Sequence, residues 1–335
     1  METLKWGFVT AGQQCMDFAN AINSYDKRCD PQHELHAVSD LYNSSGRDFL
    51  KLYNIPKLYD NYKEMVPHVD VVYIVLNNSD KYKCAKYCLE QGKHVLVVPP
   101  LALDLKQVQK LISLSKEKKL LLMEAHHARF SDTYKTLKTA INEDKLGDMM
   151  YLRANYGKNL YVTEHPRSMS TGNNLTVYRG TYLLALAQHV FSDDPANVTV
   201  TAVGGKNEDD YTWTSVVLEY SDDRRAVLTM SDQLNMANDA DIYGTNARAT
   251  LSKPIRFPTK LTIGTDVKDF PLHSSKQPYY IQNGAGNIFM AIEAGRCIKN
   301  GEFESPLITH KDMEARAQFL EIIREQLDIK FIIED

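Results

Sequence analysis

The first 125 residues alternate short β-rich runs with segments of helical periodicity. Leu4 to Val9 is a predicted strand, after which Met16, Ala19 and Ile22 recur at helical spacing. The run Val69 to Leu76 is almost continuously apolar, which is typical of a strand buried on both faces of a sheet. Strands that alternate with helices predict βαβ units around a parallel sheet.

The same pattern continues to Met123. The further predicted elements are a strand ending at His36 to Ser39, a helix including Phe49 to Leu52, a helix Ser79 to Gln91 closed by Gly92, a strand His94 to Val98 stopped by Pro99-Pro100, a helix from Asp104 to about Lys118, and a strand Leu120 to Met123. Five or six strands with intervening helices fit one Rossmann-type nucleotide-binding domain.

From Met149 onward, strand patterns follow one another through polar turns. The predicted strands are Tyr151 to Tyr156, Asn197 to Val203, Ser215 to Tyr220, Ala226 to Met230 and Ile242 to Tyr243, and two helices follow near Asn287 to Ile298 and Met313 to Leu327. Consecutive strands joined in this way predict a mostly antiparallel sheet. We therefore expect an α/β protein with a Rossmann parallel sheet in residues 1–125 and an α+β domain in residues 126–335.

The composition limits which classes of binding partner and which cellular compartment we expect. The chain of 335 residues has 39 Lys plus Arg against 43 Asp plus Glu, a net charge of -4, so nothing favours nucleic acid or an acidic membrane. No apolar run reaches the roughly 18 residues of a membrane span, and Met1 to Trp6 leads directly into a strand pattern. Five dispersed cysteines suit free thiols. We expect a cytoplasmic protein with a small-molecule or protein partner.

The turn after the first strand is a candidate phosphate site. Dinucleotide folds use G-x-G-x-x-G here, but only Gly12 falls in register, with Thr10 and Cys15 at the other two positions. The alternative is an ordinary strand-to-helix turn, although a helix N-terminus binds phosphate whatever its side chains. Asp40, at the end of the second strand, suits a ribose diol and weakly favours NAD over NADP, unless it is a solvated loop residue. The candidate cofactor-binding residues are Thr10, Gly12, Gln13, Gln14, Asp40 and Asn77.

Several longer segments resemble a known family. They are Trp6-Gly7 with Gly12, Asn54-Ile55-Pro56-Lys57, Gly92-Lys93-His94-Val95-Leu96, Met123-Glu124-Ala125, Arg129-Phe130, Leu146-Gly147-Asp148, Tyr156-Gly157-Lys158-Asn159-Leu160, Asn283-Gly284-Ala285-Gly286 and Glu304-Ser305-Pro306. Their order resembles the Gfo/Idh/MocA oxidoreductases, most of all the dimeric dihydrodiol dehydrogenases, from about residue 4 to residue 331. The resemblance implies a Rossmann domain that binds NAD or NADP. It also implies a second domain with a large open sheet, through which two copies form a homodimer.

The chemistry that the family implies is altered in this sequence. Family members carry Glu-Lys-Pro after the strand that follows Gly-Lys, and the lysine assists proton transfer beside the nicotinamide. Here the segment reads Val98-Pro99-Pro100, so the lysine position is Pro99, which has no hydrogen-bond donor. Asn77-Asn78-Ser79 also lacks the histidine that dihydrodiol dehydrogenases show.

A second signature of the family, Asp-x-Gly-x-His or Asp-x-Gly-x-Tyr, reads Tyr178-Arg179-Gly180-Thr181-Tyr182 here. Tyr178 replaces the acid, while Tyr182 stays a candidate acid/base. A phenol of ordinary pKa about 10 needs a neighbouring cation to act near neutral pH, so the alternative is that Tyr182 only walls the pocket.

Four other residues are candidates for the substrate pocket: His126, His127, Lys158 and Arg179. The pair Glu124 and His126 is too small a ligand set for a metal, so no metal is predicted. Together these features predict a dihydrodiol-dehydrogenase-like protein that is non-catalytic or weakened and acts in ligand binding, structure or interaction. The alternative is an active NAD(P)-dependent oxidoreductase for a trans-dihydrodiol or an aldose.

Overall fold

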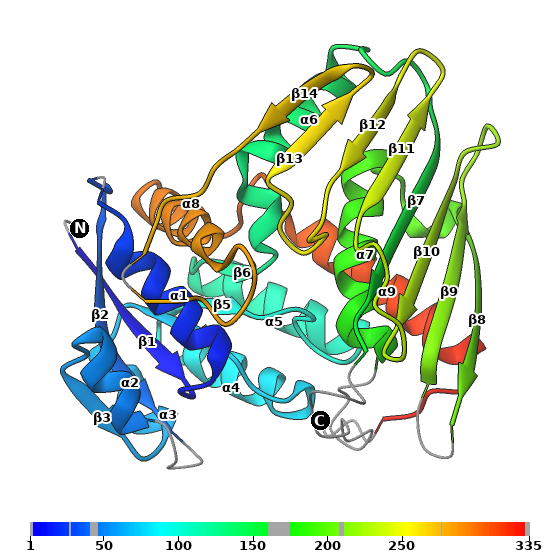
Figure 1. Cartoon of the computed structure of the whole chain (residues 1–335). Helices are drawn as coiled ribbons and strands as arrows, with labels where there is room; N and C mark the ends of the chain where they lie inside the picture. Colours follow the sequence, from blue (N-terminus) through cyan, green and yellow to red (C-terminus); the bar gives the residue numbers. More distant parts are fainter. Residues whose placement is uncertain are drawn as a thin grey trace. The chain divides into compact units, whose positions relative to one another are not determined.

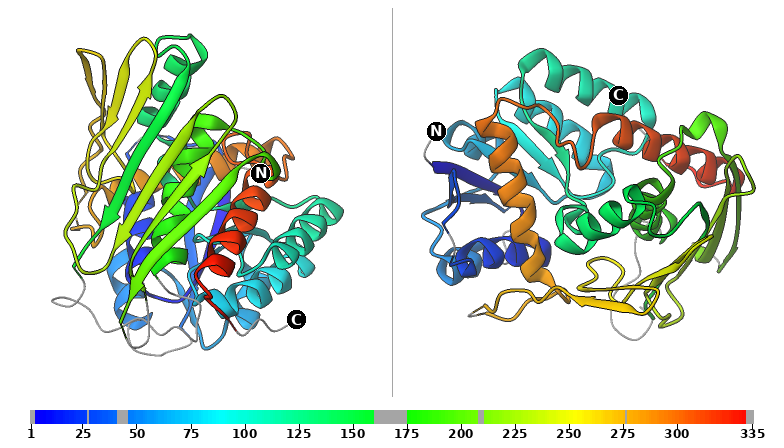
Figure 2. Two further views of the ribbon diagram at one scale, coloured as in Figure 1. Left: turned by 90° about the vertical axis from the view of Figure 1, so that its right-hand side faces the viewer. Right: turned by 90° about the horizontal axis from the view of Figure 1, so that it is seen from above.

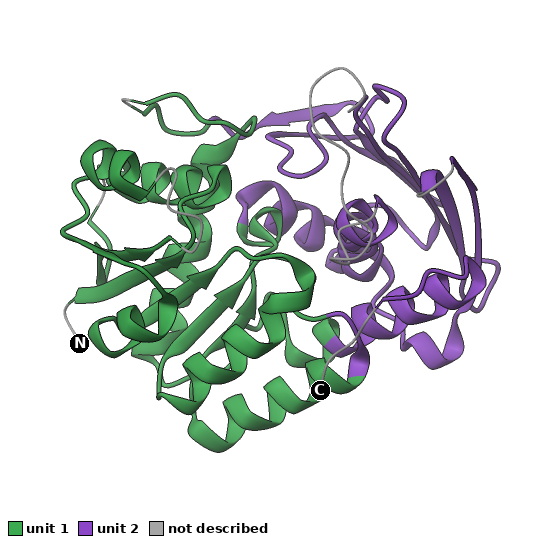
Figure 3. Cartoon of the chain, turned by 90° about the horizontal axis from the view of Figure 1, so that it is seen from below, with its two compact units in different colours: residues 1–102, 106–130, 272–313 green, residues 103–105, 131–271, 314–335 purple. Residues whose placement is uncertain are grey.

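The computed structural model describes residues 3–26, 28–40, 46–159, 175–207, 211–275 and 277–331, and the chain forms two compact units (Figure 3). The first unit comprises residues 1–102, 106–130 and 272–313; the second comprises residues 103–105, 131–271 and 314–335. This division differs from a single boundary after residue 125, because a late segment packs in the first unit. There the Asp17 carboxylate accepts hydrogen bonds from the backbone N–H groups of Tyr280, at 2.8 Å, and Ile281, at 2.9 Å.

The first unit contains a parallel sheet whose described strands have the order β3-β2-β1-β4-β5-β6 (Figure 1). The strands are β1 (Thr3–Val9), β2 (Gln32–Ser39), β3 (Lys57–Tyr59), β4 (Val71–Ile74), β5 (His94–Val97) and β6 (Leu122–Glu124). The helices of this unit are α1 (Gln13–Ser24), α2 (Gly46–Tyr53), α3 (Tyr62–Met65), α4 (Asn78–Glu90), α5 (Leu105–Lys118, which begins in the second unit) and α8 (Ile288–Lys299), with short 3₁₀ turns η1 (Val66–His68), η2 (His127–Phe130) and η5 (Gly284–Asn287). The predicted Rossmann sheet is confirmed.

Aromatic side chains fill the core on one face of this sheet. Trp6 and Phe8 of β1 are fully buried, and Phe18 of α1 meets Trp6 edge-on with ring centroids 5.1 Å apart. Phe49 of α2 meets Phe8 in the same manner at 5.6 Å. Edge-to-face packing of this kind is favourable beyond the buried area alone. Because Trp6 and Phe8 point to the same face of β1, this packing holds α1 and α2 against the sheet, with their N-termini at its carboxyl edge.

The second unit contains a mixed sheet whose described strands have the order β14-β13-β12-β11-β7-β10-β9-β8. They are β7 (Met149–Gly157), β8 (Thr199–Lys206), β9 (Tyr211–Glu219), β10 (Arg225–Ser231), β11 (Ala240–Gly244), β12 (Arg248–Leu251), β13 (Lys260–Ile263) and β14 (Asp266–Asp269). All neighbouring pairs are antiparallel except β10 and β7. The predicted, mostly antiparallel second sheet is confirmed.

Helix α7 (Leu175–Phe191) covers one face of this sheet and packs on β7, β9 and β10 (Figure 2). In β9 the side chains of Thr214, Val216 and Leu218 are buried beneath it, whereas Trp213 points to the other face and is 41% exposed. The unit also holds α6 (Asp132–Asn142), the turn η4 (Pro195–Asn197) and most of α9 (His310–Gln326). No helix within the described ranges is long and apolar enough to cross a membrane.

Candidate functional site

The carboxyl ends of β1 and β4 form the topological switch point of the first sheet, where parallel sheets bind their ligands. Thr10 follows β1 and ties this point together. Its backbone N–H donates to the Ser39 carbonyl at 2.8 Å, and its Oγ1 donates to the Val75 carbonyl at 3.2 Å. The turn is therefore anchored to the ends of both neighbouring strands.

The backbone of this turn fits a pyrophosphate. Thr10 has a φ of +83°, a left-handed conformation that glycine usually adopts. Gly12 is the N-cap of α1 and is exposed, and no side chain caps the helix. A Cβ added at Gly12 would meet only Thr10 Oγ1, at 3.7 Å, so the space in front of α1 is open. The first N–H groups of α1, at Gln13 and Gln14, thus present a positive helix end at this opening.

Asp40 and Asn77 lie at the ends of the adjacent strands. Asp40 is only 4% exposed, so it is not a solvated loop residue, and its Oδ2 accepts a hydrogen bond from Gly46 N at 2.9 Å. That contact caps α2 and leaves the ribose role as a prediction. Asn77 is the N-cap of α4, and its backbone carbonyl accepts from Asp80 N at 3.0 Å.

A buried lysine lies behind the turn at Pro99 and Pro100. Lys81, in the first turn of α4, is 3% exposed, and its Nζ donates to Asn78 Oδ1 at 2.7 Å, to the Pro100 carbonyl at 3.2 Å and to the Pro99 carbonyl at 3.3 Å. Burial lowers the pKa of Lys81 to about 7, and the charge of Glu124 opposes this shift. Lys81 was not among the residues predicted from the sequence. Its helical spacing from Ala85 and Cys88, which are buried on the same face of α4, could have indicated that it is buried too.

Glu124, the last residue of β6, holds the same turn from the other side. Its Oε1 accepts from Leu101 N at 2.8 Å, and its Oε2 lies 3.5 Å from His126 Nε2. His126 and His127 follow β6 and are 3% and 6% exposed. Their predicted place in a substrate pocket stays a prediction. Nowhere in the described ranges do three His, Cys, Asp or Glu side chains gather as metal ligands.

In the second unit, α7 brings Tyr178 and Tyr182 to one arginine that the sequence reasoning missed. Arg256 Nη2 donates to Tyr182 Oη at 3.0 Å, and Arg256 Nη1 donates to Tyr178 Oη at 3.3 Å. Tyr182 therefore has the neighbouring cation that acid/base chemistry requires. Burial nevertheless raises the pKa of Tyr182 well above its usual value, so the phenol is neutral and keeps its proton.

The two predicted cations of the second unit differ in their surroundings. Arg179 is 2% exposed, and its Nε donates to Asp232 Oδ1 at 2.8 Å, so this charge is already compensated. Its guanidinium also lies 4.5 Å from the centre of the Tyr156 ring. Lys158 directly follows β7 and is exposed. Their binding roles stay predictions.

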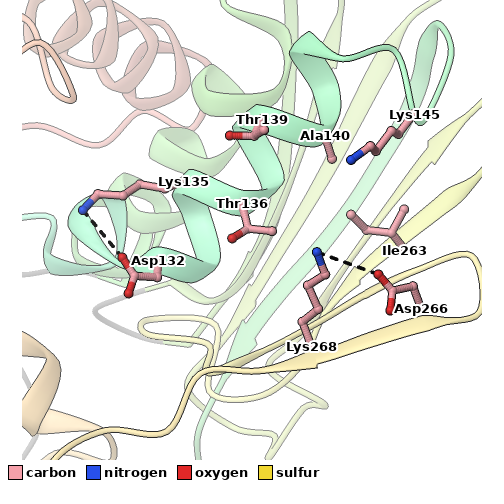
Figure 4. A pocket seen from close by; sticks show the side chains of 9 residues that line it. All are labelled: Asp132, Lys135, Thr136, Thr139, Ala140, Lys145, Ile263, Asp266 and Lys268. Atoms are coloured by element: carbon pink, nitrogen blue, oxygen red, sulfur yellow. Dashed lines mark ion pairs between the residues drawn. The ribbon is translucent and has the colours of Figure 1, made fainter.

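A cavity of about 530 Å³ lies elsewhere in the second unit, between α6 and the hairpin of β13 and β14 (Figure 4). It is lined by Asp132, Lys135, Thr136, Thr139, Ala140, Lys145, Ile263, Asp266 and Lys268. The ammonium groups of Lys135 and Lys268 lie 3.7 and 3.8 Å from the carboxylates of Asp132 and Asp266. Each of these two lysines is thus paired with an aspartate of its own element, and the cavity contains none of the candidate residues predicted from the sequence.

Comparison with known sequence families shows to which protein family the chain belongs. Residues 4–126 match the oxidoreductase family with an NAD-binding Rossmann fold, and residues 134–250 match the Gfo/Idh/MocA C-terminal domain. The chain belongs to the Gfo/Idh/MocA oxidoreductase family. Its first unit is accordingly an NAD-binding Rossmann domain, in agreement with the open turn at Gly12.

The similarity to individual relatives in the Gfo/Idh/MocA family covers nearly the whole chain. The trans-1,2-dihydrobenzene-1,2-diol dehydrogenase of Xenopus laevis is 28% identical over 330 residues, covering 98% of this chain and 99% of that protein. The human enzyme of the same name is 28% identical over 332 residues, covering 98% of each. Among solved structures, a levoglucosan dehydrogenase in complex with NADH and levoglucosan has a TM-score of 0.82 at 15% identity, covering 97% of each chain. A 3-ketoreductase from Actinomadura kijaniata, solved with NADP and TDP-benzene, has a TM-score of 0.78 at 17% identity, covering 99% of this chain and all of that one. These structures share the fold.

Proposed function

We propose that this protein binds NAD or NADP in its first unit but has lost most or all hydride-transfer activity, and acts as a ligand-binding member of its family. A bound dinucleotide supplies hydride chemistry only if a proton can follow the hydride. The observation that carries the proposal is the turn at Pro99, where the ammonium that the family uses is replaced by a residue without a donor.

The buried lysine does not restore that donor. The Lys81 ammonium has three N–H groups, and three acceptors surround it within 3.3 Å: Asn78 Oδ1 and the carbonyls of Pro99 and Pro100. The lysine is therefore committed to the backbone of the turn. We infer that it supports the shape of the nucleotide site, whereas a proton donor to a substrate must be free to leave such contacts.

The residues around the switch point would hold the dinucleotide. The N–H groups at the start of α1, from Gly12 to Gln14, suit the pyrophosphate, and Thr10 keeps that turn in place. The carboxylate of Asp40 suits a ribose diol, which favours NAD. Asn77 completes the rim of the site at the end of β4.

One observation favours a second candidate, an active NAD(P)-dependent oxidoreductase for a trans-dihydrodiol or an aldose. Tyr182 keeps its proton and accepts a hydrogen bond from Arg256 at 3.0 Å. A neutral phenol beside a fixed cation suits protonation of a substrate oxygen. The names of the relatives, which are dehydrogenases of a dihydrodiol or of levoglucosan, support the same candidate.

Two measurements separate the candidates. NADH and NADPH titrations, followed by the fluorescence of the reduced nicotinamide, test binding. Turnover with a trans-dihydrodiol and with aldoses tests the chemistry. The proposal expects saturable binding without turnover, and a gain of activity in the double variant Pro99→Lys, Tyr178→Asp. Turnover by the unaltered protein supports the active enzyme and overturns the proposal. If neither NADH nor NADPH binds, both candidate functions are overturned.

We also propose that two copies associate through the second sheet, in the cytoplasm. Exposed apolar side chains on strands of this sheet support the interface: Val203 is 54% exposed, Trp213 41% and Val267 50%. The free thiols of Cys15, Cys84, Cys88 and Cys297 support the compartment. Trp213→Arg should convert a dimer to a monomer in sedimentation velocity. Leu234→Arg, at a 62% exposed position outside the strands, should leave the dimer intact. A monomeric wild-type protein would contradict the interface.

A further inference from the structure

Arg256 lies among tyrosine side chains of the second unit. It lies between β12 and β13, and hydroxyl groups are its hydrogen-bond acceptors: Tyr182 Oη at 3.0 Å and Tyr178 Oη at 3.3 Å. The guanidinium carbon is 4.8 Å from the centre of the Tyr182 ring and 6.0 Å from that of Tyr178. Tyr156 is a third neighbouring phenol.

The charge of Arg256 is not balanced by an acid. Arg153 and Arg248 pair with Asp241, Arg179 pairs with Asp232, and Arg224 pairs with Asp193. Within the part of the chain that the structure describes, no carboxylate forms an ion pair with Arg256, and its buried Nε has no hydrogen-bond acceptor. Arg256 as a whole is partly exposed, but withdrawing part of a cation from water without a counter-charge is costly, and such groups normally find an anion.

We propose that Arg256, together with Tyr156, Tyr178 and Tyr182, forms an anion site that takes the carboxylate of a small hydroxylated ligand. The inference rests on the proposed function, because Tyr178 and Tyr182 occupy the signature positions of the substrate domain. It deepens that function by naming the class of ligand.

The chemistry of the four side chains selects a carboxylate. A guanidinium presents two parallel N–H groups that match the two oxygens of a carboxylate, and Nε lies on such an edge with no acceptor of its own. Burial raises the pKa of Tyr156 and Tyr182, so these phenols carry no charge that would repel an anion. The rings provide flat walls for a carbon skeleton. A neutral diol would leave the guanidinium uncompensated.

Calorimetric titration of the full-length protein tests this site without any dinucleotide. The probes are the sodium salts of acetate, D-gluconate and D-glucuronate, with sodium chloride at equal ionic strength and neutral D-glucose as references. The variants are Arg256→Met, which removes the charge, and Arg256→Lys, which keeps the charge but removes the planar fork. Arg225→Met is the matched control, since Arg225 also lies over a tyrosine ring, 5.3 Å from the centre of Tyr151, on the same sheet.

We expect at least one sugar acid to bind at least tenfold more tightly than glucose. That preference should disappear in Arg256→Met, weaken severalfold in Arg256→Lys and persist in Arg225→Met. Equal binding of glucose and the acids, absence of binding by all three carboxylates, or full anion binding in Arg256→Met each overturns the site. If Arg256→Met does not fold, Arg256→Lys decides, because unchanged anion affinity in that variant contradicts the role of the fork. The NADH titration is independent, so a failed anion site and a failed dinucleotide site are distinguishable.

Discussion

The buried lysine beneath the Pro99 turn makes the stability of the protein depend on pH in a specific way. Burial lowers the pKa of Lys81 to about 7, whereas a lysine in the unfolded chain titrates near 10.4. Between these values the unfolded state holds a proton that the native state has released. The free energy of unfolding therefore rises with pH through this window, and the cost of the buried charge is fully present below pH 7.

The size of the effect follows from the two pKa values. Integrating the proton difference from pH 6 to pH 8.5 gives a gain of about 2 kcal/mol, with a slope that approaches about 1.4 kcal/mol per pH unit. The variant Lys81→Met has no titrating group here, so its stability relative to wild type should fall by that amount across the window. Other groups titrate equally in both proteins and cancel in the difference.

Urea unfolding at half-unit steps from pH 6 to pH 8.5 measures this difference. Lys86→Met is the matched control, since Lys86 lies on the same helix, has a half-exposed side chain and pairs with Glu90 at 3.9 Å. Its stability should run parallel to that of wild type at every pH. A constant difference between wild type and Lys81→Met would refute the reasoning, because it would mean that Lys81 stays charged in the native state as it does in the unfolded state.

Three further predictions concern the nucleotide turn, two histidines and a buried ion pair. Gly12→Ala should weaken NADH binding at least tenfold while changing the unfolding free energy by less than about 1 kcal/mol, because the new Cβ meets only one atom, at 3.7 Å; unchanged affinity in fluorescence titration would contradict the assigned site. His33 and His94 have pKa values held at about 4 by burial, so stability should be lost as pH falls from 6.5 to 4, by roughly 2 kcal/mol for each; a His94→Asn variant with an unchanged acid limb in urea unfolding would argue against this. Asp232→Asn should lower the free energy of unfolding by about 3 kcal/mol, because it leaves the buried guanidinium of Arg179 unpaired. Asp193→Asn should lower it by about 1 kcal/mol, because that ion pair is about one-fifth exposed. Equal losses in urea unfolding would contradict the dependence on burial.

The sequence pattern predicted elements that are buried and regular. The apolar run that contains β4 and the alternation in β9 follow from which faces meet a core, and these elements lie where expected. Several elements escaped. Helix α6 and strands β12 and β13 were passed over, as was β3, which has only three residues. In β14 all four side chains are exposed, so no apolar alternation marked it. Edge strands without a buried face carry little periodic signal.

The candidate site was predictable only where it depends on local order in the chain. The turn at Thr10 and Gly12 follows from a strand that leads directly into a helix. Arg256 was not predictable in this way, because it is 74 residues from Tyr182 and meets it only once the second unit has folded. Lys81 was visible as a lysine on a buried helix face, yet its contact with the Pro99 carbonyl requires the packing of α4 beside the end of β5.

The central claim is that the protein binds a dinucleotide but has no group that delivers a proton to the substrate. A continuous measurement of absorbance tests this claim most directly. The unaltered protein, saturated with NADH or NADPH as shown by nicotinamide fluorescence, is mixed with a panel of carbonyl compounds derived from dihydrodiols, aldoses and sugar acids. The account predicts that the absorbance of the reduced nicotinamide stays constant in the unaltered protein and decays once Pro99→Lys and Tyr178→Asp are introduced. A decay in the unaltered protein at multiple turnovers per site would contradict it.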